Sequence, residues 1–264
     1  MALFLLATQF LTRVPVPSAG DFQARWLSGS LRYFPLVGGL VGLAAATVWW
    51  LSSHWFPPTI AVGLALAASL LITGAFHEDG FADTCDGLGG GNTRERALAI
   101  MKDSRIGAFG AVGLIILLGL KWSALAALPS AAFWLILVAA HVVSRWYAIG
   151  LVWALPYARA DGAGKSREFA GGLSGAQWLL SGAIGVPAVA IPVIWPGVPV
   201  NAALAAAAGV GFGAAAVTAL AAAAYFKRRI GGYTGDCLGA VQQVSELTFL
   251  LGALAVLRSA MPPS

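Results

Sequence analysis

The stretch "PPTIAVGLALAASLLITGAFHEDGFADTCDGLGGG", residues 57–91, joins an uncharged run to a cluster of acidic residues. A helix needs roughly 20 apolar residues to cross a bilayer, and residues 57–76 are long enough to do so. The chain has only 11 acidic residues, and four of them fall within nine positions: Glu78, Asp79, Asp83 and Asp86. The pattern predicts a membrane helix that carries carboxylates at its end.

The composition extends this prediction to the whole chain. Hydrophobic residues make up 59% of it and charged residues 10%, with a mean hydropathy of +0.80. A soluble domain typically carries about 25% charged residues, so lipid must be the solvent for much of this surface. We therefore expect an all-α fold, a polytopic integral membrane helical bundle, with residues 1–264 forming a single membrane-embedded domain.

Seven segments have the length and apolar character of transmembrane helices, although six or eight helices also fit the pattern. The predicted spans are residues 33–52, 58–77, 107–128, 131–154, 176–195, 200–225 and 237–258. The N-terminal run "MALFLLATQFL" is too short to span and is followed by Arg13 and two prolines. We expect it to form a short helix that lies in the membrane interface or re-enters the membrane.

The placement of positive charge predicts the orientation of the chain. Between these spans, 13 of the 16 Lys and Arg residues fall on the same side of the membrane, which the positive-inside rule makes cytoplasmic. We expect a multi-pass protein of the bacterial cytoplasmic (inner) membrane, with its active site facing the cytoplasm. This rule also explains the net charge of +5, so we expect membrane lipid and no nucleic acid as a partner.

Three of the clustered carboxylates share one helical face. At 100° per residue, Asp83 lies about 40° and Asp86 about −20° from Asp79. Oxygen ligands at this spacing suit Mg²⁺, which accepts a few carboxylates and keeps waters or substrate phosphates. We expect one or two Mg²⁺ at these three residues, which are also catalytic candidates, with Glu78 beside them about 100° away on the helix. The alternative is a solvated helix end whose carboxylates pair with Arg94, Arg96 and Lys102.

The segment after the acidic cluster is predicted to turn back along the membrane surface. The glycines of residues 87–91 should end the helix, because glycine holds helical structure poorly. Asn92, with Glu95 three residues later, resembles the start of a further helix. Carboxylates that hold Mg²⁺ beside several Arg and Lys side chains indicate chemistry on a diphosphate.

The segment "KDSR", residues 102–105, is a candidate phosphate site. We expect Lys102 and Arg105 to contact phosphate and Asp103 to orient one of them, with Ser104 contributing to substrate binding. An ordinary cytoplasmic anchor would explain the basic residues but not the aspartate and serine between them.

The segment "GGYTGDCLGAVQQVSE", residues 231–246, places polar groups at the start of the last span. An acidic residue within an apolar helix normally faces a cavity or a partner. Asp236 and Glu246 are therefore candidate metal ligands or proton acceptors, and Thr234 is a candidate substrate-binding residue. Pairing of the acidic residues with Lys227, Arg228 or Arg229 is the alternative.

Three further basic residues are candidates for substrate binding. Arg145 lies four residues after His141 in the fourth span, at a depth where arginine is costly. It pairs with the acidic cluster or binds phosphate, or else the two residues form a buried structural pair. Arg159 and Lys165, in a loop at residues 157–169, either bind a substrate phosphate or only fix the topology.

Several motifs resemble those of the adenosylcobinamide-GDP ribazoletransferase (cobalamin synthase) family. They are "QFLTRVPVP", "TGAFHEDGFADTCDGLGGG", "RERALAIMKDSRIGAFGAVGL" and "RRIGGYTGDCLGA" followed by Glu246, so the resemblance runs nearly end to end. It implies a Mg²⁺-dependent membrane transferase of late cobalamin (vitamin B12) biosynthesis, in nucleotide loop assembly. Adenosylcobinamide-GDP and α-ribazole, or its 5′-phosphate, would give GMP and adenosylcobalamin, or its 5′-phosphate. The resemblance also suggests two kinds of protein partner: further copies of this chain in a homo-oligomer, and other enzymes of the cobalamin pathway.

Two rival functions fit parts of the pattern. A CDP-alcohol phosphatidyltransferase does related chemistry on lipid, and "DTCDG" at residues 83–87 matches the start of its aspartate signature, but the rest of that signature is missing. An ion or solute transporter would place its charges near the bilayer midplane, whereas nearly all of these lie at one face.

Overall fold

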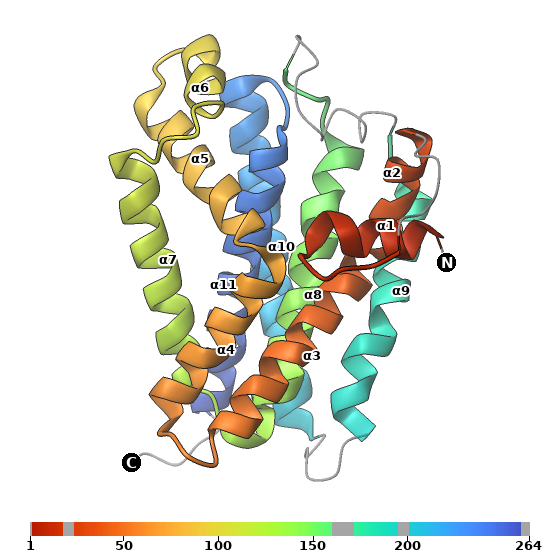
Figure 1. The fold of residues 1–264 in the computed structure, drawn as a ribbon, viewed down its shortest axis with the longest axis vertical. Coiled ribbons are helices and arrows are strands. Elements are labelled where there is room, and N and C mark those ends of the chain that lie inside the picture. The colour runs from red at the N-terminus through yellow and green to blue at the C-terminus, as the bar shows by residue number, and fades with distance from the viewer. Residues whose placement is uncertain (1, 18–23, 160–171, 195–200, 260–264) are drawn as a thin grey trace.

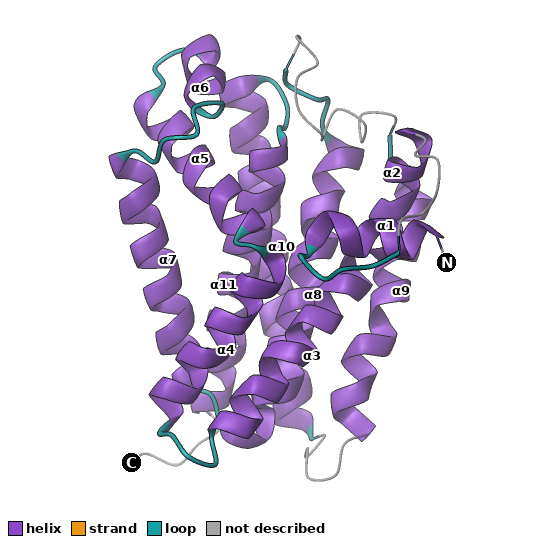
Figure 2. Ribbon diagram, in the orientation of Figure 1, coloured by secondary structure: helices purple, strands orange, loops and turns teal. Residues whose placement is uncertain are grey.

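The chain folds into a bundle of helices in the computed structural model, which describes residues 2–17, 24–159, 172–194 and 201–259. Figure 1 shows the bundle with its long helices side by side, and Figure 2 shows that the described residues form helices and loops, without a strand. The expected all-α fold is confirmed. In chain order the helices are α1 (Ala2–Leu11), α2 (Ala24–Ser30), the 3-10 turn η1 (Leu31–Tyr33), α3 (Phe34–Ser52), α4 (Pro58–Thr73), α5 (Phe76–Gly90), α6 (Arg94–Ile100), α7 (Ala108–Ala126), α8 (Ser130–Ala154), α9 (Gly175–Ile194), α10 (Ala202–Ile230) and α11 (Gly235–Ser259).

Five helical segments of the described chain are long and apolar enough to cross a membrane, and a sixth span forms if α4 and α5 count as one. The five are Trp26–Ser52, which includes α3, and helices α7, α8, α10 and α11. Helix α9 is apolar, but its apolar stretch within the described residues, Gly175–Ile191, is shorter than a membrane span. The polytopic architecture is confirmed, whereas the count of seven spans stays a prediction.

The second predicted span, residues 58–77, is not one straight helix. Helix α4 ends at Thr73, and α5 starts at Phe76 in a direction bent by 88°. Gly74 and Ala75 both adopt left-handed backbone angles, with φ of 66° and 55°. This conformation suits glycine but strains alanine by roughly 1–2 kcal/mol. The acidic cluster therefore lies on a separate helix that leaves the direction of the span.

The helix end expected at residues 87–91 is confirmed at the last glycines of that stretch: α5 ends at Gly90, and Gly91 has extended backbone angles. Gly87 lies within the helix and allows close packing, because a Cβ there would lie 2.9 Å from the Ala97 carbonyl oxygen. The expected cap at Asn92 was wrong by one residue. Thr93 caps α6, and its hydroxyl accepts a hydrogen bond of 3.2 Å from the Arg96 backbone N–H.

Helix α1 lies across the long helices, near the level at which α4 gives way to α5 (Figure 1). The backbone N–H of Arg13, just after α1, donates a 2.7 Å hydrogen bond to the carbonyl of Ile72 in the last turn of α4. This contact ties the N-terminal segment to the α4–α5 break. The expected short helix at the N-terminus is therefore present, and its place in the membrane, interfacial or re-entrant, stays a prediction.

Helix α8 is the centre of the bundle. It packs against α3, α9, α10 and α11, and most of its residues are buried. Near its N-terminal end the ring of Phe133 stacks on Trp49 of α3 at 3.9 Å between ring centroids. Near its middle, α8 buries His141, Ser144 and Arg145, so the core of the bundle contains charge as well as apolar side chains.

Candidate active site

Helices α5 and α11 cross at two glycines. A Cβ at Gly80 would lie 3.1 Å from the Cα of Asp236, and a Cβ at Gly239 would lie 2.9 Å from the carbonyl oxygen of His77. These distances are tighter than ordinary van der Waals contact, so only glycine lets the two backbones come this near. The crossing brings the acidic residues of α5 beside the start of α11.

Four aspartates gather at this crossing. Asp79 is exposed, Asp83 is half-buried and Asp86 is buried. Asp83 interacts electrostatically with Asp79, Asp86 and also Asp236 of α11. The structure therefore brings together the three predicted carboxylates of α5 and the predicted Asp236, as residues of two helices separated by about 150 positions in the sequence.

Asp86 has backbone partners of its own. Its Oδ2 accepts a 2.7 Å hydrogen bond from the N–H of Gly107, and its Oδ1 accepts a 2.8 Å bond from the N–H of Gly110. A carboxylate is favourable at this position because the first N–H groups of a helix lack intrahelical partners. Asp86 thus fixes α5 to the first turn of α7, a role that the sequence prediction did not assign to it. The two glycines in "GAFG", residues 107–110, are the only sequence signal for this contact.

Arg159 lies against the acidic group. Its guanidinium donates a 2.8 Å hydrogen bond to Asp236 Oδ2, and the hydroxyl of Thr234 donates to the same oxygen at 3.2 Å. Backbone pairing holds the two loops together: the Ala158 N–H donates to the Tyr233 carbonyl, and the Tyr233 N–H donates to the Pro156 carbonyl. The predicted residues Arg159, Thr234 and Asp236 therefore form one group, whereas Lys165 lies outside the described residues.

The segment after α6 contains an exposed ion pair. Arg105 donates hydrogen bonds to both carboxylate oxygens of Asp103, the shortest from its terminal nitrogen at 2.6 Å. These bonds lower the pKa of Asp103 to about 2 and raise the pKa of Arg105. The predicted orientation of a basic residue by Asp103 is thus present in the geometry. Ser104 and Lys102 are exposed in the same segment, and contact of these residues with phosphate stays a prediction.

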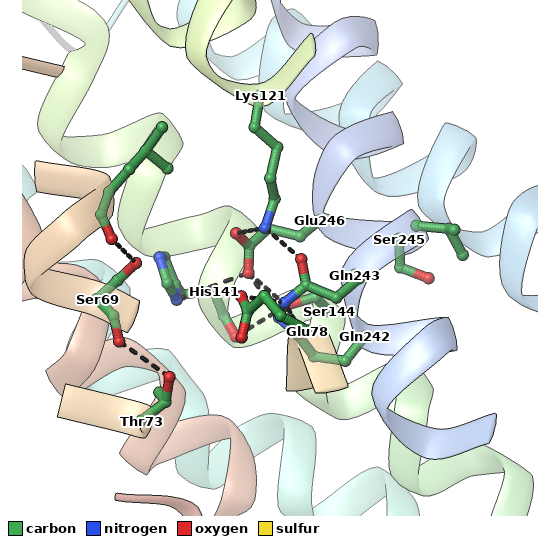
Figure 3. Close-up of polar contacts among 12 residues, drawn as sticks. Ser69, Thr73, Glu78, Lys121, His141, Ser144, Gln242, Gln243, Ser245 and Glu246 are labelled. Carbon is green, nitrogen blue, oxygen red and sulfur yellow. Dashed lines mark hydrogen bonds and ion pairs between the residues drawn. The ribbon is translucent and has the colours of Figure 1, made fainter. Parts of the chain in front are cut away.

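A second polar group is buried between α7, α8 and α11 (Figure 3). Lys121 of α7 lies 2.7 Å from Glu246 Oε1, and it also donates a 2.7 Å bond to the side-chain oxygen of Gln243. The other oxygen of Glu246 accepts a 2.6 Å bond from Gln242. Lys121 was not among the predicted site residues, although a lysine within a predicted span was the available signal.

Glu246 therefore has no aspartate among its partners. The side chains that surround it are basic or neutral: Arg145 lies 3.6 Å and His141 3.7 Å from its Oε2. Arg145 also donates to the backbone carbonyl of His141 at 3.1 Å. These contacts match the buried structural pair that was the alternative for Arg145. A catalytic or metal-binding role for Glu246 stays a prediction that none of its contacts supports.

Glu78 connects the two groups. It follows His77 on the side of α5 that faces the bundle, and its Oε1 accepts a 2.7 Å hydrogen bond from the side-chain nitrogen of Gln243 (Figure 3). Its other oxygen is buried without a hydrogen-bond partner. Through this hydrogen bond, Glu78 joins α5 to the pair of Lys121 and Glu246. Its predicted place beside a metal stays a prediction.

Two arginines that were alternative partners of the acidic residues, Arg94 for the cluster on α5 and Arg229 for Asp236 or Glu246, donate to backbone carbonyls in the structure. Arg94 donates to the carbonyls of Ile230 and Ala158, each at 2.8 Å. Arg229 donates to the carbonyls of Leu88 and Gly91, at 3.2 and 2.8 Å. Both arginines therefore hold helix ends together, and Arg159 is the cation that pairs with Asp236.

The donor set of the acidic group fits a hard divalent cation. Asp79, Asp83 and Asp236 offer only carboxylate oxygens, which are the ligands that Mg²⁺ prefers. Within the described residues, no three His, Cys, Asp or Glu side chains lie close enough together to hold a metal ion by themselves. Sites for Mg²⁺ commonly use one or two carboxylates and take their remaining ligands from water and substrate phosphates. Metal binding by this group stays a prediction.

Comparison with known proteins gives a consistent result. The family model described as Cobalamin-5-phosphate synthase matches residues 3–254. A protein of Leptothrix cholodnii named adenosylcobinamide-GDP ribazoletransferase is 47% identical over 258 residues, covering 96% of this chain and 95% of that protein. Proteins with the same name from Ralstonia pickettii and Vibrio parahaemolyticus are 43% and 41% identical, covering 96% and 97% of this chain and 95% and 92% of their own lengths. No solved structure matches the chain significantly.

Proposed function

The chain belongs to the cobalamin-5-phosphate synthase family, and we propose on that premise that it is an adenosylcobinamide-GDP ribazoletransferase. It would join adenosylcobinamide-GDP to α-ribazole or α-ribazole 5′-phosphate and release GMP. The crossing of α5 and α11 is the observation that supports specific residues for this reaction, because aspartates of both helices lie there beside Arg159.

The reaction forms one phosphorus–oxygen bond and breaks another. A ribose hydroxyl of the acceptor attacks the phosphorus nearest cobinamide, and the bridging oxygen leaves with GMP. Asp79 is proposed to accept the hydroxyl proton, because it is the exposed member of the acidic group. Arg159 would bind the diphosphate, since a guanidinium can make two parallel hydrogen bonds to phosphate oxygens.

Mg²⁺ is the proposed cofactor, with one or two carboxylates among Asp79, Asp83 and Asp236 as its protein ligands and water or the substrate as the source of the others. When bound, it would neutralise charge that develops on the diphosphate. Asp86 would keep α5 at its angle to α7 through the two glycine N–H groups, so that the ligand oxygens of α5 stay facing α11. Arg159 would also hold the Asp236 carboxylate in position through their ion pair.

The proposed location is the bacterial inner membrane with the acidic group toward the cytoplasm. Arg94, Arg105, Arg159 and Arg229 all lie at the ends of helices near α6, which is the end of the bundle at the top of Figure 1. The positive-inside rule favours the cytoplasm for that end. Assembly into homo-oligomers or with other enzymes of cobalamin synthesis stays a prediction.

The test is release of GMP by detergent-solubilised protein given adenosylcobinamide-GDP, with and without α-ribazole 5′-phosphate. We expect release only with both substrates, loss of release with a chelator of divalent cations, and recovery on adding Mg²⁺. Asp83→Asn should lower turnover by about 100-fold or more. Glu95→Gln, an exposed acidic residue of α6, is the matched control and should keep normal turnover. Full activity of Asp83→Asn, or release of GMP without acceptor, would contradict the proposal.

A further inference from the structure

A cleft of about 950 Å³ opens between α1, α2 and the α4–α5 break, next to the acidic group. Its wall contains Gln9, Phe10, Arg13, Gly74, Phe76 and, at one side, Asp79. Binding sites for small molecules commonly enclose about 300–1,000 Å³ and combine apolar walls with a few polar groups. The cleft is therefore large enough for a substrate, and one wall residue belongs to the proposed catalytic group.

Arg13 supplies the positive charge of the cleft. Its side chain lies directly on Gly74: a Cβ there would come within 3.0 Å of Arg13 Cγ and Cζ. Arg13 is exposed, and its guanidinium has no hydrogen-bond or ion-pair partner among the described residues. The left-handed Gly74 thus both turns the chain into α5 and leaves room for a cation at the head of the acidic helix.

The apolar part of the wall is aromatic. The ring of Phe76 is 43% exposed although it lies inside this cleft, and Phe10 contacts it edge-on at 5.3 Å between centroids. Phe10 is in turn stacked on Phe34 at 5.7 Å, which holds the pair in place. An exposed aromatic ring beside an unpaired guanidinium is suited to a flat base that carries one phosphate.

Resting on the function proposed above, we propose that this cleft binds the acceptor as a nucleoside monophosphate. Its 5′-phosphate would contact Arg13, its base would pack on Phe76, and its ribose hydroxyl would point toward Asp79. The donor carries a diphosphate, whose greater charge calls for Mg²⁺ and Arg159 rather than a single arginine. The inference makes Arg13 the residue that distinguishes α-ribazole 5′-phosphate from unphosphorylated α-ribazole.

The test is direct binding of each acceptor to the full-length protein in detergent, by calorimetry, with no donor present. The wild-type protein should bind α-ribazole 5′-phosphate about 10- to 100-fold more tightly than α-ribazole. Arg13→Gln should abolish this difference in affinity by weakening the binding of only the phosphorylated acceptor. Arg13→Lys should restore part of the difference. Because each variant is compared on two ligands, loss of folded protein affects both measurements alike and leaves the ratio unchanged.

Two results would overturn the inference. One is a wild-type protein that binds both acceptors equally, and the other is an Arg13→Gln protein that keeps the full ratio. In parallel, Phe76→Ala should weaken the binding of both acceptors by a similar factor. An equal loss of affinity for adenosylcobinamide-GDP in this variant would assign the cleft to the donor instead. Binding without release of GMP would contradict the proposed function while leaving the assignment of the cleft intact.

Discussion

Lys121 and Glu246 form an ion pair of 2.7 Å in the interior of the bundle, with side chains only 3% and 4% exposed. Charges in such a place need partners, because an unpaired ion in a medium of low polarity is costly. Gln243 links this pair to Glu78 and hence to α5. The pair therefore supports the helix that carries the acidic group, although it lies outside that group.

Removal of one member of this pair is expected to destabilise the protein strongly. Lys121→Met or Glu246→Gln should each cost on the order of 3–5 kcal/mol if the remaining charge stays buried. The double variant should recover part of the loss, because both charges of the pair are removed together and only Arg145 loses an acidic partner. Thermal unfolding in detergent measures all three. If Glu246→Gln instead keeps wild-type stability and loses only turnover, Glu246 acts in catalysis as the sequence analysis expected.

Substitution of Gly74 is expected to disrupt the α4–α5 break. Gly74→Ala puts a side chain on a residue with φ of 66° and against Arg13, so it should lower the free energy of unfolding by about 1 kcal/mol or more. Gly119→Ala is the matched control: a Cβ at this helical glycine of α7 meets nothing within 4 Å, and the change should be neutral or stabilising by up to about 1 kcal/mol. Equal melting temperatures for the two variants would rule out the left-handed turn.

Two neighbouring arginines of α6 should differ in their effect on stability. Arg94 holds the carbonyls at the end of α10 and in the loop after α8, so Arg94→Gln should cost about 1–3 kcal/mol. Arg96 is exposed, and no side-chain hydrogen bond or ion pair joins it to the described residues, so Arg96→Gln should leave the melting temperature nearly unchanged. A larger shift for Arg96→Gln than for Arg94→Gln would contradict the contacts of α6.

Labelling of introduced cysteines tests the orientation. Ser104 and Ser53 are exposed at opposite ends of the bundle, just before α7 and just after α3. In intact spheroplasts, a membrane-impermeant maleimide should label Ser53→Cys, whereas Ser104→Cys should react only after lysis. The wild-type protein supplies the background from the two native cysteines, Cys85 and Cys237. The reverse labelling pattern would place the acidic group outside the cell.

Much of the fold follows from hydropathy, because long apolar runs have few alternatives in lipid. The break at Gly74 could not be predicted in the same way. A single glycine within "LITGAF" is compatible with a straight helix, and the contact of Gly74 with Arg13, 61 positions earlier in the chain, is not contained in the local pattern. The glycines at 87–91 end the helix as predicted, but only at Gly90, since packing of Gly87 against Ala97 compensates for its low helix propensity.

The site was predicted in part, because helical spacing describes one helix at a time. It placed Asp79, Asp83 and Asp86 on one face, and the structure agrees that they lie together. It could not show that the N–H groups of α7 would engage Asp86, or that a lysine of α7 would reach Glu246. Such contacts depend on how separate helices pack, and no periodicity within one helix contains that information.

Gly80 and Gly239 determine how near the two acidic helices come to each other, so the absence of a side chain at both positions would set the width of the proposed metal site. One added methyl group at either position would spread the oxygens of α5 and α11 apart while leaving every charge in place. If the proposed site binds a cation, preference among ions of different radius, such as manganese or calcium over magnesium, would then shift through backbone spacing alone. Two residues without side chains would thus set the selectivity of the carboxylates beside them.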